Sequence, residues 1–254
     1  MKISIITVCF NSAKTLQDSI SSVAFQSYSN VDYILVDGAS KDGTLEILQK
    51  NSKYISQLVS EPDKGIYYAM NKGIALAKGD IIGILNSDDF YANNQVLDLV
   101  AKAFKEDSLL DACYSDLEYI DQVNSSKVIR YWKSSQFFLG AFSKGWCPPH
   151  TTFFVRRSVY ERYGVFNLKY NIAADVELMM RFLEVHKIKT KYIPKTWVKM
   201  RMGGTTNKNF KNLWRQNQEI LKALKMHSLS LNYISFFTHK LISRIKQFLL
   251  RAGQ

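Results

Sequence analysis

The sequence predicts an α/β fold: a doubly wound, mostly parallel central sheet with helices on both faces, followed by a helical basic tail. Apolar, β-branched runs alternate with runs of helical periodicity over the first 85 residues. The segments between apolar runs are long enough for right-handed helical crossovers, which join neighbouring parallel strands. A length of 254 residues with 46% hydrophobic side chains suits one large domain with an appendage.

The elements of the first half follow in order. Residues 3–8 are apolar on both faces, as expected of a buried parallel strand. Asn11 and Ser12 can cap a helix in which Leu16 and Ile20 begin an apolar stripe of helical spacing. The same patterns predict strands at 32–36, 57–60 and 80–85, and helices near 44–51 and over 66–78.

The cysteines and the first apolar run bear on the cellular compartment. Cys9, Cys113 and Cys147 are widely spaced and form no CxxC pair. This pattern argues against a disulfide framework and a thiolate zinc site, and it favours a reducing compartment. The first apolar run stops at Asn11, which makes it too short for the apolar core of a signal peptide. We therefore expect it to be the first strand of the mature fold.

The net charge of +12 is unevenly distributed along the chain. Residues 1–110 carry 10 Lys and Arg against 13 Asp and Glu, whereas residues 111–254 carry 24 against 9. A basic second half indicates an anionic partner: a phosphorylated substrate, a membrane surface or nucleic acid. Solubility is the alternative explanation of the excess charge.

Polar residues gather where the predicted parallel strands end, which is where such sheets bind ligands. Carboxylates occur there at Asp37, at Asp63 and at the pair Asp88 and Asp89. The sequence contains neither GxGxxG nor GxxxxGK[ST], which argues against dinucleotide and P-loop sites. Two adjacent carboxylates after a buried strand are costly unless a cation such as Mg²⁺ or Mn²⁺ binds. The alternative is that one of them caps a helix beginning near 93–95.

The chain contains, in order, TVCFNSAKTLQDSISSVAFQSYSNVDYILVDGASKDGT, EPDKGIYYAMNKGIALAKGDIIGILNSDD, GWCPPHTTFFVRR, FNLKYNIAADVELMMRF and VKMRMGGTTN. These motifs resemble the bacterial glycosyltransferases of family 2, which have the GT-A fold, and among them they are most similar to O-antigen and exopolysaccharide enzymes. The resemblance implies a GT-A domain at 1–210 and a helical basic extension at 211–254. Within the domain it implies a nucleotide-sugar half at 1–100 and an acceptor half at 101–210.

The resemblance also implies roles for the strand-end residues. Thr7 and Asn11 would line the nucleotide pocket, and Asp37 would accept hydrogen bonds from the base, which is usually uracil in this family. Tyr67 or Tyr68 would face the sugar unless it belongs to the core. The other implied contacts to the nucleotide-sugar are Asp63, Lys64, Asn71, Ser87 and Asp88.

Residues 86–89 correspond to the family's DxD motif, with Asn86 in place of the first Asp. The match implies that Asp88 is the main metal ligand and that Asp89 is the second candidate. One protein carboxylate plus two phosphate oxygens suits Mn²⁺ or Mg²⁺, which would neutralise the leaving diphosphate.

Asp175 matches the family's catalytic Glu-Asp pair, with Ala174 in place of the Glu. An inverting transfer needs a base that takes the acceptor proton on the face of the sugar opposite the leaving group. Capping of a helix over 176–184 is the other role open to Asp175, and the two roles are compatible. Glu177 is the alternative base.

His150, Arg201 and Thr205 are the expected contacts to acceptor or diphosphate. His150 follows two prolines that fix the approach of its loop, although a lone histidine is more often structural. Arg201 and Thr205 lie in a glycine-containing segment able to close over phosphate oxygens.

These features predict an inverting, metal-dependent transferase that moves a hexose, galactose or an N-acetylhexosamine, from a UDP-sugar to a glycan acceptor in cell-surface polysaccharide biosynthesis. The acceptor is expected to be lipid-linked. A sugar nucleotidyltransferase is the alternative enzyme, but residues 8–14 lack its glycine-rich basic loop. A non-enzymatic basic protein that binds a membrane or nucleic acid is the alternative from another class. Phosphate contacts do not require acidic strand ends, so we expect no nucleic-acid partner.

The tail at 231–254 predicts a peripheral attachment to the cytoplasmic face of the inner membrane. From Leu231 to Arg251 apolar residues recur every three or four positions among Lys and Arg, and no acid follows Glu219. Such a helix is too interrupted by charge to span a bilayer, but it suits the interface of an anionic membrane. A helix packed on the catalytic domain is the alternative.

Overall fold

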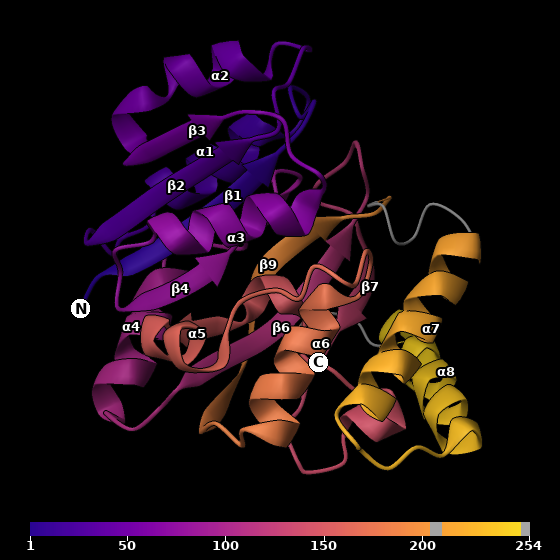
Figure 1. Cartoon of the computed structure of the whole chain (residues 1–254). Coiled ribbons are helices and arrows are strands. Elements are labelled where there is room, and N and C mark those ends of the chain that lie inside the picture. The colour runs from indigo at the N-terminus through magenta and orange to yellow at the C-terminus, as the bar shows by residue number, and fades with distance from the viewer. Residues whose placement is uncertain (204–209, 250–254) are drawn as a thin grey trace.

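The computed structural model describes residues 1–203 and 210–249. The elements of its first half are β1 (Ile3–Cys9), α1 (Leu16–Ala24), β2 (Val31–Asp37), α2 (Thr44–Lys50), a 3-10 turn η1 (Ser52–Tyr54), β3 (Gln57–Ser60), α3 (Ile66–Leu76) and β4 (Ile81–Ile84). The four strands lie in the order β3-β2-β1-β4, and all their pairings are parallel (Figure 1). The strands and helices predicted here from periodicity are confirmed.

Alternate residues of β1 show why both faces of the sheet are covered. Ile6 and Val8 belong to one buried cluster, which includes side chains of α3. Ile3 and Ile5 belong to a second cluster on the other face, which includes side chains of α1 and α2. A strand with helices on both sides has to be apolar at every position, which is the pattern of residues 3–8.

The second half completes a mixed sheet. β8 (Phe154–Arg156) runs antiparallel between β4 and β6 (Ala112–Ile120), and β9 (Thr190–Arg201) runs parallel to β6. β5 (Asp89–Tyr91) pairs antiparallel with the end of β9, and β7 (Val128–Trp132) pairs with β6. Because Asp89 lies opposite Met200, the end of β9 is held beside the segment that follows β4. The predicted α/β class is confirmed; the sheet is mixed, and each of its antiparallel pairs includes a strand of this half.

The remaining elements are the helices α4 (Val96–Glu106), α5 (Arg157–Tyr163), α6 (Ala174–Met180), α7 (Phe210–Met226) and α8 (Tyr233–Leu249), the 3-10 turns η2 (Phe142–Lys144) and η3 (His150–Thr152), and a π-helical turn η4 (Arg181–Val185). The helix predicted over 176–184 therefore starts at Ala174 and widens after Met180. β8 begins only at Phe154, because the Pro149 carbonyl accepts hydrogen bonds from the N–H and hydroxyl of Thr152 and turns the chain there.

The prediction that Asn11 and Ser12 cap α1 with their side chains is wrong. Asn11 has a left-handed backbone (φ 49°), its N–H donates to the Ser40 hydroxyl at 2.8 Å, and its side-chain oxygen accepts the Lys41 N–H at 2.9 Å. At Ser12 the backbone carbonyl oxygen, and not the side-chain hydroxyl, accepts a hydrogen bond from the N–H of Leu16. The loop after β1 is thereby fastened to the loop after β2.

The two C-terminal helices pack on the domain and on each other. Figure 1 shows α7 and α8 in yellow, adjacent to β7 and α6. Side chains of both helices, including Leu224 and Phe236, belong to the same buried cluster as Ile6 and Val8. The Lys240 ammonium of α8 donates to the Asn217 side chain of α7 at 2.6 Å. Among the helices of the described residues, none combines the length and apolarity needed to cross a bilayer.

Candidate active site

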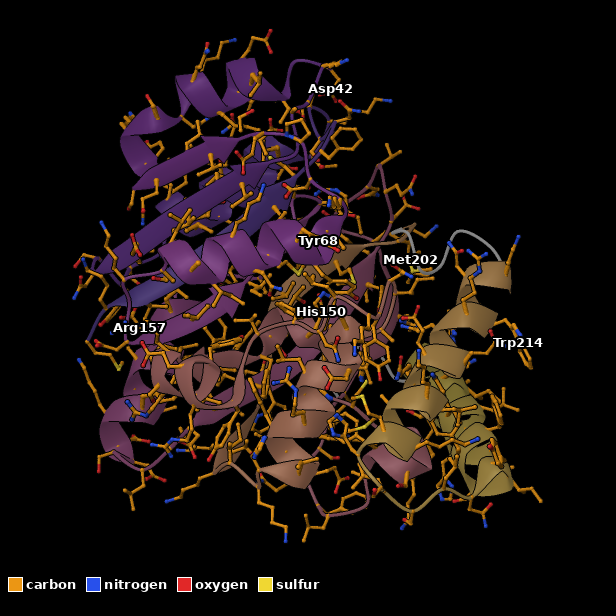
Figure 2. All side chains as sticks on the ribbon, in the orientation of Figure 1. Asp42, Tyr68, His150, Arg157, Met202 and Trp214 are labelled. Atoms are coloured by element: carbon orange, nitrogen blue, oxygen red, sulfur yellow. The ribbon has the colours of Figure 1, made fainter. Side chains whose placement is uncertain are left out.

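Three segments bring Asn86, His150 and Asp175 together beyond the carboxyl end of β4. His150 Nδ1 lies 3.4 Å from a carboxylate oxygen of Asp175, and its Nε2 lies 3.3 Å from the amide nitrogen of Asn86. An amide NH₂ only donates, so Nε2 of a neutral ring accepts this bond and the proton sits on Nδ1, facing Asp175. Figure 2 shows His150 below Tyr68 of α3, near the centre of the molecule. The predicted base and the predicted histidine are thus neighbours.

Tyr67 holds the other oxygen of Asp175. Its hydroxyl is 3.1 Å from this oxygen and 2.9 Å from the Ile172 carbonyl oxygen, and its ring stacks obliquely on Phe166. Burial, and secondarily the charge of Asp175, raises the pKa of Tyr67 well above its ordinary value, so the phenol stays a donor. Of the two tyrosines considered for the sugar, Tyr68 is the exposed one. Asp175 itself keeps 17% of its side chain exposed.

The segment 86–89 offers hard oxygen ligands. Asp89 is buried, its Oδ2 accepts the Asn86 amide at 3.1 Å, and its Oδ1 has no hydrogen-bond partner among the described residues. Burial raises the pKa of Asp89 well above its ordinary value, and the neighbouring Asp88 adds to this effect. Asp88 is partly exposed. Neither residue caps a helix, since Asp89 opens β5 and the N-cap of α4 is Gln95.

These oxygens fit a divalent cation of the Mg²⁺ or Mn²⁺ type. Such cations take one or two protein carboxylates and complete their coordination with substrate phosphates and water. Asp88 provides a carboxylate at the surface, and an orphaned buried oxygen of Asp89 lies next in sequence. Within residues 1–203 and 210–249, no three His, Cys, Asp or Glu side chains gather into a metal cage.

Arg201, at the end of β9, braces this segment. One of its nitrogens donates to the Asp88 carbonyl oxygen at 2.9 Å, and another binds the Asp18 carboxylate of α1. The guanidinium also lies over the ring of Phe90, 5.1 Å from its centroid. Arg201 therefore lies beside Asp88 and Phe90, and much of its hydrogen-bonding capacity goes to the protein. Thr205 lies outside the described residues.

Three of the predicted nucleotide contacts point into the protein. Thr7 is fully buried and accepts a hydrogen bond from Tyr33 at 3.2 Å. The buried Asp37 carboxylate accepts hydrogen bonds from the hydroxyls of Ser40 at 2.5 Å and Ser60 at 2.6 Å. The hydrogen bonds of Asp37 fasten the loop after β2 to the end of β3, and the contacts of Thr7 and Asp37 to a nucleotide stay predictions.

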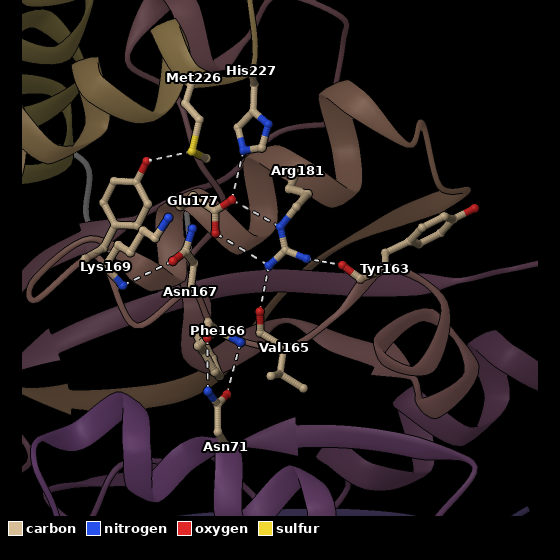
Figure 3. Close-up of polar contacts among 11 residues, drawn as sticks. Asn71, Tyr163, Val165, Phe166, Asn167, Lys169, Glu177, Arg181, Met226 and His227 are labelled. Atoms are coloured by element: carbon tan, nitrogen blue, oxygen red, sulfur yellow. Dashed lines mark hydrogen bonds and ion pairs between the residues drawn. The ribbon is translucent and has the colours of Figure 1, made fainter.

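Asn71 is likewise bound within the protein. Its side-chain amide donates to the Phe166 carbonyl and accepts the Phe166 N–H, both at 3.0 Å (Figure 3). This pair of bonds ties α3 to the segment before α6. The polar capacity of Asn71 is thereby taken by backbone that lies 95 residues further along the chain.

The remaining predicted nucleotide residues lie nearer the surface. Asn11 and Lys64 are exposed, and Ser87 shares a hydrogen bond of 2.9 Å with Ser12. Asp63 pairs with Lys72 at 2.7 Å. The sequence interpretation overlooked Phe10, which is 64% exposed and whose ring packs beside Gly38 at the ends of β1 and β2. An aromatic residue directly after a buried strand and before polar loop residues was the available signal, because an exposed ring there can stack on a base.

Glu177, the alternative base, is a structural residue. Its side chain is 1% exposed and is bound by Arg181 Nε at 3.1 Å and His227 Nε2 at 2.8 Å (Figure 3). Burial on its own raises the pKa of Glu177, but the hydrogen bonds from His227 and Arg181 outweigh burial and lower this pKa below 4.5. The cluster joins α6 to the end of α7, and Asp175 is the carboxylate of α6 that reaches the surface.

Comparisons with known proteins identify the family of the chain. The family model for glycosyl transferase family 2 matches residues 4–164. A PGL/p-HBAD biosynthesis glycosyltransferase of Mycobacterium bovis (strain BCG / Pasteur 1173P2) is 30% identical over 193 residues, which cover 75% of this chain and 73% of that protein.

Solved structures share the fold, which is of the GT-A type. S. aureus TarS 1-349 in complex with UDP matches with a TM-score of 0.64 and 16% identity over 98% of this chain and 72% of that chain. In a longer TarS structure, the chain spans 46% of the length. The mannosyltransferase PcManGT of Pyrobaculum calidifontis, in complex with GDP-Man and Mn²⁺, matches with a TM-score of 0.66 and 18% identity over 98% and 69%. The chain belongs to glycosyl transferase family 2 and is a glycosyltransferase.

Proposed function

We propose that this glycosyltransferase moves a hexose, galactose or an N-acetylhexosamine, from a UDP-sugar to a glycan acceptor with inversion at C1. The position of Asp175 carries the proposal, because its partly exposed carboxylate is fixed by Tyr67 and faces His150 beside the segment 86–89. The UDP and UDP-GlcNAc complexes of TarS support a UDP-sugar donor. A sugar nucleotidyltransferase and a non-enzymatic basic protein are set aside by family membership.

In the proposed reaction the acceptor hydroxyl oxygen attacks C1 of the donor sugar. Its bond to C1 forms as the bond from C1 to the diphosphate oxygen breaks, and the hydroxyl proton passes to Asp175. Tyr67 and His150 hold the carboxylate in one orientation for this transfer. One carboxylate suffices, which agrees with Ala174 standing beside it.

Asp88 would hold Mn²⁺ or Mg²⁺, with Asp89 as the second candidate ligand. When bound, the cation supplies positive charge to the leaving diphosphate. The protein itself fixes the segment 86–89. Arg201 donates a hydrogen bond to the Asp88 carbonyl oxygen, and the Asn86 amide donates one to the Asp89 carboxylate. The Mn²⁺ complex of the Pyrobaculum mannosyltransferase supports a metal in this role.

The acceptor in this proposal is lipid-linked, and the product is a cell-surface polysaccharide such as an O-antigen. The enzyme works at the cytoplasmic face of the inner membrane and attaches through the tail at 231–254. Apolar side chains of α8, including Ile234 and Leu241, are exposed, and the same helix exposes Lys246, which supports an anionic lipid surface as partner.

The donor and the metal are tested together. Release of UDP or GDP is measured for a panel of UDP-hexoses and GDP-mannose, with Mn²⁺, with Mg²⁺ and with EDTA, and the anomeric configuration of the product is read by NMR. We expect turnover with one UDP-sugar, inversion at C1 and dependence on the metal. Turnover with GDP-mannose alone, or retention at C1, would contradict the proposal.

Substitutions separate the two candidate ligands. Asp88→Ala is expected to abolish turnover and to weaken metal-dependent binding of UDP by about tenfold or more, since it removes the accessible carboxylate. Asp89→Ala is expected to weaken this binding less. Titration calorimetry with UDP measures both, and equal UDP affinity of the wild type with Mn²⁺ and with EDTA would refute the metal assignment.

A further inference from the structure

Glu219, on α7, receives three successive backbone N–H groups from the segment that leads into α6. Its Oε2 accepts the N–H of Ile172 and of Ala173, each at 2.9 Å, and both of its oxygens lie 3.1 Å from the N–H nitrogen of Asn171. Asp175 is the second residue of α6, so these bonds fix the backbone immediately before it.

These hydrogen bonds reach Ala173, the N-cap residue of α6, and the two residues before it. Glu219 therefore fixes the backbone that enters α6, from a different helix. A negative charge at this end also interacts favourably with the helix dipole. Hydrogen bonds to an ionised acceptor are about twice as strong as neutral ones, so the contact holds its geometry well.

Tyr67, which also contacts the Asp175 carboxylate, holds the same segment from its other side. The Tyr67 hydroxyl contacts both the Ile172 carbonyl oxygen and the Asp175 carboxylate. Glu219 and Tyr67 therefore clamp the peptide groups around Ile172 between α7 and α3. A shift of this segment moves Asp175 relative to His150 and to the acceptor oxygen.

We propose that Glu219 is a positioning residue for Asp175, through which the C-terminal helix α7 sets the orientation of the base. The inference rests on the proposed function for the role of Asp175. Glu219 is the last acidic residue of the chain, in a region of 15 Lys and Arg from residue 187 onward. Attraction to the surrounding basic side chains is enough to explain an acid at this position. The hydrogen bonds to three successive N–H groups go further, because they direct the carboxylate to one backbone segment.

The variants are Glu219→Ala, which deletes the carboxylate, and Glu219→Gln, which keeps one accepting oxygen. His227→Gln is the matched control, because His227 also ties the end of α7 to α6, but through Glu177, which follows Asp175 by two residues. Each variant is measured for kcat, for the KM of the donor, for UDP affinity and for Tm.

We expect Glu219→Ala to lower kcat by about tenfold or more with the donor KM and UDP affinity within about twofold of wild type, because a small misplacement of a reacting group is costly in rate. Glu219→Gln should recover part of kcat. His227→Gln should lower Tm and leave kcat within about twofold. A wild-type kcat in Glu219→Ala, or an equal loss of kcat in His227→Gln, would overturn the proposal.

Amide hydrogen exchange at residues 171–173, in enzyme without substrate, supplies a readout independent of activity. Exchange there should be about tenfold or more faster in Glu219→Ala and unchanged in His227→Gln. Unchanged exchange in Glu219→Ala would refute the clamp. If the wild type transfers no sugar but the exchange result is obtained, the proposed function fails while the clamp stands.

Discussion

Asp37 and Asp175 are both aspartates at the functional edge of the sheet, and their surroundings give them different tasks. Asp37 is buried and accepts hydrogen bonds from two serine hydroxyls, so it closes loops. Asp175 has one oxygen on Tyr67, the other opposite His150, and part of its side chain at the surface. A base has to be both oriented and accessible, and Asp175 meets both requirements.

Asp175→Asn removes a proton acceptor while keeping the size of the side chain. We expect transfer to fall by about 10²-fold or more, with UDP affinity within a few-fold of wild type, because the substitution acts on the acceptor proton and not on nucleotide binding. Steady-state kinetics and UDP titration measure the two quantities. Near wild-type turnover would mean that another group takes the proton.

The sequence located the site but not the direction of each side chain. Polar residues at the strand ends lie at one edge of the sheet because parallel strands end together, and this much follows from periodicity. Whether Thr7 points to the cleft or to Tyr33 depends on tertiary contacts, and the partner of Asn71 lies 95 residues away in the chain. Asp175, by contrast, was predicted from its match to a family motif, and that prediction did not depend on knowing its contacts.

Among the elements, α6 depends on contacts made by its neighbours. Glu219 of α7 binds the backbone before it, and Glu177 binds His227 and Arg181 along it. Strands and helices of the first half were predictable because each repeats its pattern locally. The mixed second half was not, since β5, β6 and β9 pair across long stretches of sequence and the pattern of one strand does not reveal its partner.

The buried Glu177 makes the tie between α6 and α7 sensitive to acid. Its pKa is lowered in the folded state, so its contribution to stability is present above its ordinary pKa of 4.5 and is lost as the pH falls through the lowered value. Glu177→Gln should therefore destabilise the protein at pH 7 and have a smaller effect at pH values below the lowered pKa of this carboxyl group. Urea unfolding at a series of pH values measures this, and an equal loss of stability at every pH would contradict it.

In the whole molecule, α8 has two faces. Phe236 and Gln247 are buried against the domain, and burial lowers the pKa of Lys240 on the same side. The opposite side exposes a band of large apolar side chains: Ile234 (78%), Leu241 (62%), Ile245 (51%), Phe248 (54%) and Leu249 (76%). Packing on the domain and contact with a membrane are therefore compatible, because they use different sides of one helix.

Deleting the tail at 231–254 would expose the buried cluster that contains Phe236. Substitutions on the exposed face of α8 therefore test membrane attachment better than a deletion does. The variant carries Ile234→Ser, Leu241→Ser and Ile245→Ser, and the matched control carries Leu109→Ser and Val123→Ser, which are exposed elsewhere on the protein. Wild type and control should cosediment with vesicles rich in anionic lipid, because basic side chains such as Lys246 are each attracted to charged headgroups by about 1 kcal/mol. Cosedimentation should weaken at high salt, which screens this attraction.

The variant should remain in the supernatant, because the apolar face no longer gains from burial among acyl chains, and it should hydrolyse the donor in solution at a rate close to that of wild type. Turnover of a lipid-linked acceptor in vesicles should fall, since the tethered enzyme meets that acceptor at a raised effective concentration. Cosedimentation of the variant as strong as that of wild type, or a wild type that stays in the supernatant, would show that the exposed face of α8 serves a partner other than a membrane.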